Sequence, residues 1–434
     1  MSRFVKIFRR GFVADMSALM VGRVLGQAVS FAAIPILTRL YAPDAFGFAA
    51  IVVSLGAIIG GVGGLRMDRA IVLPRSIAAS LNIAAFSIIA GVATALLCLA
   101  GFALLQPWLL ARWHFSPEQF LLLALFAPTL GASHLLGEIV AQVALKTRRV
   151  RCLAALYASR PAVTVCVQGT FVLYAADPLG LISGYLVGGV FFALAGIFFL
   201  RRNLFGTAGR LRARAMIAAA CRYRSFIIYN TPQKLFMLVG QNLPVFVLGA
   251  FFSPAVVGAW FLVRRALSAP TSLLCDTARQ AMTMRAAERR RARQDLRAMY
   301  IKVLIGLLAL CLPPAALLAA AGPEIVSVVF GDQWHLAGEF IAIFSIAWLT
   351  GILAMPAGVM IDVYGRHKIA LIHQVAATTA RTAALATGGI LGDALLAIGL
   401  YAWTGAVFAL GLIVYGYTLA AGPAGRAATA LSNT

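Results

Sequence analysis

The stretch "YAPDAFG", residues 41–47, has a near copy in the second half of the chain, "FSPAVVG", residues 252–258. Each places an aromatic residue, a proline and a glycine at the same spacing. Proline is favoured in the first turn of a helix, and glycine lets membrane helices approach closely. The copy predicts two halves that each begin a second helix in the same way.

A pair of basic residues is separated by the same number of positions as the two motifs. Shifting the chain by 211 positions puts Tyr41 on Phe252 and also puts Arg23 on Lys234. A weaker echo relates "TRRVR" (147–151) to "YGRHK" (364–368). The alternative to a repeat is chance, because proline at the start of a helix and glycine at a helix contact are both common in membrane proteins. The matched basic residue favours a true repeat.

The composition places the chain in a membrane. Of its 434 residues, 62% are hydrophobic and only 12% are charged, too little polar surface for a water-soluble protein of this size. Apolar stretches long enough to cross a bilayer predict twelve spans, with eleven or thirteen as alternatives. They are residues 12–38, 46–65, 78–105, 119–143, 152–174, 179–200, 224–250, 255–274, 301–321, 337–361, 369–390 and 394–418.

Positive charge predicts the orientation. Most of the 37 Lys and Arg residues fall on alternate loops, whereas the opposite loops hold only Arg39 and Arg112. Because basic loops stay in the cytoplasm, both termini are predicted to be cytoplasmic. We expect an all-α fold with a six-helix lobe at 1–200, a basic cytoplasmic linker at 201–223, and a second six-helix lobe at 224–434. The lobes would form a parallel repeat with the substrate path between them.

Six basic residues lie within predicted spans and away from the first and last residues of those spans. A charge at the centre of a spanning helix costs about 2.5–3.5 kcal/mol on insertion scales, so it normally faces a polar interior. Carboxylates within the spans are fewer, so the interior is cationic and indicates an anionic ligand. The alternative is that individual side chains snorkel to the interface or pair with backbone carbonyls. The candidate substrate-binding residues are Arg23, Arg160, Lys234, Arg264, Arg265 and Arg381.

Other signals are weaker. His134 and Glu138 lie four residues apart on one helix face, which suits either a proton-coupling pair or a structural hydrogen bond. The basic run 284–302 predicts an interfacial helix. Basic residues at the ends of spans face acidic lipid headgroups, which makes nucleic acid a poor partner. Catalytic motifs, long outer loops and metal-ligand spacings are missing from the sequence, so we expect no enzyme, cofactor or metal.

Three longer segments carry a resemblance to a known family: residues 38–76, "FFSPAVVGAWFLVRRALSAPTSLL" (251–274) and "FGDQWHLAGEF" (330–340). The chain resembles the polysaccharide-transport branch of the multidrug/oligosaccharidyl-lipid/polysaccharide exporters, and more narrowly the Wzx-type flippases for O-antigen or exopolysaccharide. This resemblance implies two lobes around a central cationic cavity in a bacterial inner membrane. Lipid II flippases are related but have two more spans, which disfavours that assignment.

The resemblance also implies a substrate, a polyprenyl-pyrophosphate-linked oligosaccharide moved from the inner to the outer leaflet by alternating access. Arg23, Lys234, Arg264, Arg265 and Arg381 would meet its pyrophosphate or acidic sugars. Membrane lipids and the polysaccharide polymerase and chain-length machinery would be partners. Two alternatives stay open: a cation-coupled exporter of drugs or metabolites in the same superfamily, and a membrane glycosyltransferase or ligase.

Overall fold

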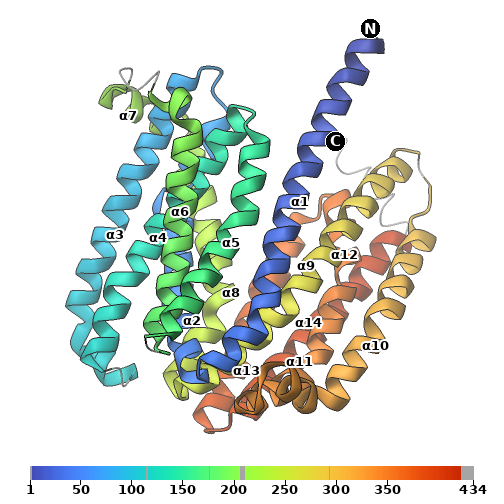
Figure 1. The fold of residues 1–434 in the computed structure, drawn as a ribbon. Coiled ribbons are helices and arrows are strands. Elements are labelled where there is room, and N and C mark those ends of the chain that lie inside the picture. Colours follow the sequence, from blue (N-terminus) through green and yellow to red (C-terminus); the bar gives the residue numbers. More distant parts are fainter. Residues whose placement is uncertain (1, 114–115, 175, 206–210, 293, 422–434) are drawn as a thin grey trace. The chain divides into compact units, whose positions relative to one another are not determined.

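The chain folds into long helices (Figure 1). The computed structural model describes residues 2–113, 116–174, 176–205, 211–292 and 294–421, and no strand occurs in these ranges. The elements are α1 Ser2–Leu40, α2 Pro43–Gly63, η1 Met67–Val72, α3 Ile77–Trp113, α4 Pro117–Lys146, α5 Val150–Val172, α6 Pro178–Phe205, α7 Ala213–Arg222, η3 Phe226–Asn230, α8 Thr231–Phe251, α9 Pro254–Arg291, α10 Arg297–Phe330, η4 Asp332–Trp334, α11 His335–Leu353, α12 Met355–Tyr364, α13 His367–Ile390 and α14 Ala394–Ala421.

Ten segments of the described chain are long and apolar enough to cross a membrane, which makes this a multi-pass membrane protein. The predicted spans at 255–274 and 369–390 are helical, within α9 and α13, but are not among the ten. Both carry arginine within the helix, which lowers their hydropathy. The count of twelve and the cytoplasmic termini therefore stay predictions. The basic run 284–302 is not a separate helix, because α9 reaches Arg291 and α10 starts at Arg297.

The chain forms two compact units, Met1–Phe246 and Val247–Thr434. In the first, α2 and α3 pack on α4, and α6 packs on α4 and α5. In the second, α9 and α10 pack on α11, and α14 packs on α11 and α13. This recurring order of contacts is what a parallel repeat predicts.

The division between the units differs from the predicted lobes. It falls inside α8, not in the linker 201–223, and so leaves α7 and most of α8 with the N-terminal helices. The local reason is packing: α7 lies against α3, and η3, which leads directly into α8, lies against η1. The lobes 1–200 and 224–434 stay a prediction about function.

The repeated stretches begin equivalent helices. Pro43 is the first residue of α2 and Pro254 the first of α9, and the preceding residues, Ala42 and Ser253, share the same extended backbone. Tyr41 is fully buried, and its hydroxyl donates a hydrogen bond of 2.7 Å to the carbonyl oxygen of Gln168 on α5. The motif therefore has a structural role, since it fixes the start of α2 against α5.

Glycine allows a close contact between α2 and α4 in the first unit. A Cβ atom added to Gly60 of α2 would lie 2.6 Å from the carbonyl oxygen of Gly131 on α4 and 2.9 Å from the Cβ of His134. Membrane helices gain packing energy by such small-residue contacts. The close approach of α2 and α4 also positions the next segment of the chain, η1.

Candidate functional site

The segment between α2 and α3 folds into the protein. Met67, Ala70 and Ile71 of η1 are fully buried, in a core shared with α3 and α4. Leu65 and Arg66, just before η1, both have positive φ angles of 51° and 56°. Residues other than glycine rarely adopt this left-handed conformation, which costs free energy. The turn is locally unfavourable, and such strain is often found in functional segments.

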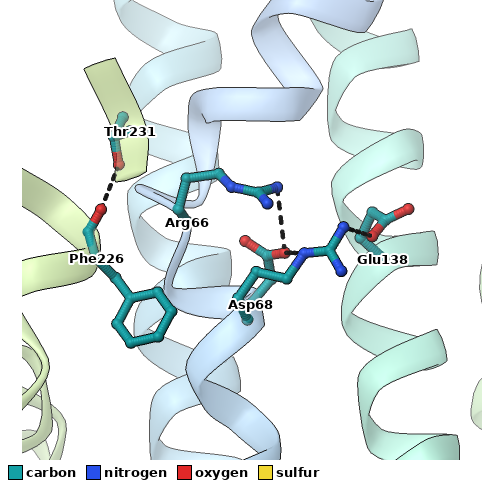
Figure 2. Close-up of polar contacts among 6 residues, drawn as sticks. Arg66, Asp68, Glu138, Phe226 and Thr231 are labelled. Atoms are coloured by element: carbon teal, nitrogen blue, oxygen red, sulfur yellow. Dashed lines mark hydrogen bonds and ion pairs between the residues drawn. The ribbon is translucent and has the colours of Figure 1, made fainter. Parts of the chain in front are cut away.

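A network of charges lies on this segment. Asp68 Oδ2 is 3.7 Å from Arg66 Nη1 and 3.6 Å from Arg69 Nε, and Arg69 Nη2 is 3.7 Å from Glu138 Oε2 on α4 (Figure 2). These distances are those of ion pairs and are too long for hydrogen bonds. Among the described residues, Arg66 Nε and Asp68 Oδ2 are buried without a hydrogen-bond partner. The network is therefore held together by charge and keeps unused hydrogen-bonding capacity.

Burial governs the titration of Asp68. Its side chain is only 5% exposed, and this burial raises the pKa of its carboxyl above the ordinary value of 3.8. Arg66 and Arg69 lower the pKa in part, and Glu138 raises it. The loss of hydration outweighs the attraction of the two guanidinium groups.

Polar contacts attach this segment to its surroundings. The Lys146 ammonium group, at the end of α4, donates to the carbonyl oxygen of Val72 at 3.1 Å and also to that of Pro74. At the start of α8, the Thr231 hydroxyl donates to the carbonyl oxygen of Phe226, on the neighbouring π-helical turn η3, at 3.2 Å (Figure 2). The network thus lies among α4, η1 and the start of α8.

The predicted residues His134, Glu138 and Lys234 belong to this cluster. His134 lies one helical turn from Glu138, and its Nδ1 is buried without a hydrogen-bond partner in the described chain. Glu138 forms its ion pair with Arg69. Lys234, on α8, lies within electrostatic range of Asp68, Glu138 and the two arginines. The predicted coupling role of His134 and Glu138 stays a prediction.

The predicted residues Arg23 and Arg160 lie against aromatic rings of the same unit. Arg23 Cζ is 4.9 Å from the ring centre of Tyr157, and Arg160 Cζ is 5.8 Å from that of Phe192. The two rings are 5.5 Å apart. The negative face of an aromatic ring stabilises a cation without neutralising it. The rings therefore support both guanidinium groups without supplying a counter-charge.

The remaining predicted cations lie in the second unit. Arg381 Cζ is 4.2 Å from the ring centre of Tyr401, and Arg264 lies within electrostatic range of both. Tyr401 packs against the buried ring of Trp260 at 5.5 Å. Arg265 follows Arg264 on α9 and is half-buried. This unit therefore has its own cationic cluster, supported by aromatic rings.

Sequence reasoning placed Arg66 and Arg69 among ordinary loop charges and passed over Asp68. A signal was present: in "LRMDRAIV", residues 65–72, an acidic residue lies between two arginines spaced three apart and is followed by an apolar run. An apolar run of this kind is not expected in a solvent-exposed loop and indicates a buried segment. Within the described residues, no group of three or more His, Cys, Asp or Glu side chains could hold a metal ion.

Comparison with known proteins gives a family and a fold. The profile of the family described as "Polysaccharide biosynthesis protein" matches residues 36–338. No curated protein sequence matches the chain. The fold resembles the lipid II flippase MurJ in an inward closed conformation, at 12% identity and a TM-score of 0.65, over 93% of this chain and 87% of that one.

Two further solved structures share the fold. One is a MOP superfamily transporter from Pyrococcus furiosus, at 12% identity and a TM-score of 0.57, over 97% of this chain and 96% of that one. The other is an inward-facing multidrug resistance MATE family transporter of the MOP superfamily, at 14% identity and a TM-score of 0.55, over 96% of each chain. At these identities the likeness establishes the fold alone.

Proposed function

Since this chain belongs to the polysaccharide biosynthesis protein family and has the fold of MOP superfamily transporters, we propose that it is a flippase for a lipid-linked oligosaccharide. The substrate is a polyprenyl-pyrophosphate carrying an O-antigen or exopolysaccharide repeat unit. The protein moves it from the inner to the outer leaflet of the bacterial cytoplasmic membrane, without a catalytic step. The similarity in fold to the lipid II flippase MurJ supports this class of substrate by analogy.

The observation that carries the proposal is the excess of cations along the helices. In the first unit, Arg23, Arg160 and Lys234 lie on α1, α5 and α8, and Arg23 and Arg160 contact aromatic rings. In the second unit, Arg264 and Arg381 lie around Tyr401. A cation within a spanning helix is costly unless it faces a polar interior, and these cations outnumber the carboxylates of the predicted spans, so an anionic ligand is the natural partner.

Alternating access would move the substrate between the leaflets. In this mechanism the predicted lobes at 1–200 and 224–434 rock against each other about the linker 201–223. The cations hold the pyrophosphate, while the polyprenyl tail stays in the bilayer. Polymerase and chain-length proteins would receive the exported repeat unit.

Purified protein in proteoliposomes tests the function directly. A labelled polyprenyl-pyrophosphate oligosaccharide is placed in one leaflet, and its arrival in the other is followed by exposure to a membrane-impermeant enzyme. We expect translocation that Arg23→Ala and Lys234→Ala abolish. The matched control is Arg75→Gln, because Arg75 is exposed and forms no ion pair with any described residue. Full translocation by both alanine variants would refute the proposed role of these cations.

A cation-coupled exporter is the second candidate, because the MATE family transporter shares the fold. Such an exporter needs a carboxylate that is free to bind a cation. Carboxylates are few within the predicted spans, and one of them, Glu138, is paired with Arg69 at 3.7 Å, which favours the flippase. Uptake of cationic dyes by the same proteoliposomes, without movement of the glycolipid, would reverse this preference.

A further inference from the structure

We propose that Arg66, Arg69 and Lys234 form a binding site for phosphate oxygens, and that the Asp68 carboxylate occupies it until the ligand arrives. All four residues belong to the first unit. The inference rests on the proposed function in one respect, since it takes the ligand to be the pyrophosphate of the lipid carrier. The site itself follows from the geometry of the cluster.

Two guanidinium groups converge on one oxygen atom. Arg66 Nη1 and Arg69 Nε lie 3.7 and 3.6 Å from the same Asp68 Oδ2. Each guanidinium group carries several N–H donors in a planar fork that matches phosphate oxygens. A single carboxylate at ion-pair distance cannot satisfy so many donors, and Arg66 Nε is buried without a hydrogen-bond partner. A pyrophosphate offers more oxygen atoms and more charge than Asp68.

The charges of the cluster do not cancel. Arg66, Arg69 and Lys234 carry three positive charges, while Asp68 and Glu138 carry at most two negative charges. Lys234 forms no hydrogen bond or ion pair with the described residues. This ammonium group is therefore available to an incoming anion.

Asp68 is a weak occupant of its own site. Burial disfavours its ionised form, and its contacts with the two arginines are longer than hydrogen bonds. Arg69 is shared between Asp68 and Glu138, and its side chain is 48% exposed, so the guanidinium group is accessible. A stronger anion can replace the carboxylate at the two guanidinium groups without breaking a hydrogen bond to either of them.

The surrounding structure holds the site in place. Lys146 fixes the far end of η1 through the carbonyl oxygens of Val72 and Pro74, and the buried side chains of η1 fix its middle. The π-helical turn η3 packs on η1 and leads into α8, which carries Lys234. The three cations thus come from elements that pack together, not from independent loops.

Binding of inorganic pyrophosphate to the full-length protein in phosphatidylcholine nanodiscs tests the site. We expect Arg66→Gln and Arg69→Gln each to weaken binding about tenfold or more, because each loses charge-assisted hydrogen bonds. Arg75→Gln, in the same loop, should bind as the wild type does. Asp68→Asn should bind several-fold more tightly, because the competing carboxylate is gone.

One further variant and one further lipid composition distinguish the possible outcomes of the binding experiment. Arg66→Lys keeps the charge and retains part of the binding if the site is correct, even if Arg66→Gln folds poorly. Unchanged pyrophosphate affinity in both glutamine variants, or no binding by the wild type, overturns the proposal. Nanodiscs that contain phosphatidylglycerol show whether the phosphate oxygens come from bulk lipid. Competition by this lipid that depends on Arg66 and Arg69 would overturn the pyrophosphate assignment.

The binding and translocation assays fail independently. If the wild type moves the glycolipid but the cluster variants bind pyrophosphate normally, this site is refuted and the flippase stands. If pyrophosphate binding depends on the cluster but glycolipid is not moved, the flippase is refuted and the anion site stands.

Discussion

Replacing Gly60 by alanine tests how closely α2 and α4 are packed beside the charged cluster. The new Cβ atom would lie 2.6 Å from the carbonyl oxygen of Gly131, about 0.8 Å short of ordinary contact, and 2.9 Å from the Cβ of His134. Both neighbours are held by the α4 backbone, so the helices must separate. Overpacking of this kind costs about 1–3 kcal/mol. Alanine also favours the helix by about 1 kcal/mol, which hides part of this cost.

A second glycine isolates the cost of packing. Gly101 of α3 is also helical, but a Cβ atom there would meet nothing within 4 Å. Gly101→Ala therefore gains the same helix propensity without a clash. Thermal unfolding of both variants in detergent should give a lower midpoint for Gly60→Ala than for Gly101→Ala. Translocation should fall as well, since His134 must move. Equal midpoints would refute the close contact of α2 and α4.

Three further predictions follow from single contacts. Gly405→Ala should reduce translocation at an unchanged thermal midpoint, because its Cβ atom would lie 3.0 Å from Arg381 Nε and displace a flexible side chain. The wild type should lose stability as pH rises from 3.8 through the raised pKa of Asp68, since the native carboxyl holds its proton more tightly than the unfolded one. Asp68→Asn should remove that slope in pH-dependent unfolding, and an unchanged slope would contradict the assignment. Tyr41→Phe should lower the free energy of unfolding by about 1 kcal/mol and so lower the thermal midpoint, because the buried Tyr41 hydroxyl donates to the backbone carbonyl oxygen of Gln168. An unaltered midpoint would count against that hydrogen bond.

The sequence predicted the helical segments well, because long apolar runs are typical of membrane helices. The prolines predicted to start helices, Pro43 and Pro254, were confirmed as the first residues of α2 and α9. Several helix contacts recur in both units, but the repeat proposed from these prolines stays a prediction. The division of the chain within α8 could not be predicted, because it depends on η3 packing against η1 and not on any local signal.

The candidate cations could be predicted from the sequence, because a charge within a spanning helix is energetically costly. The residues that contact them could not be predicted. Arg23 and Arg160 stand out in a hydropathy scan, whereas the aromatic rings beneath them come from other parts of the chain and look like ordinary packing residues. Asp68 was passed over because η1 is too short and too charged to resemble a span. Only the three-dimensional structure shows that this segment is buried.

The left-handed backbone at Arg66 has a consequence for protein engineering. A design procedure that chooses residues by backbone preference would place glycine there and would relieve a local cost of about 1–2 kcal/mol. The designed protein would have a more favourable backbone at this position but would have lost one of the cations that meet at Asp68. In this chain, the substitution that local geometry recommends is one that a search for improved transporters should avoid.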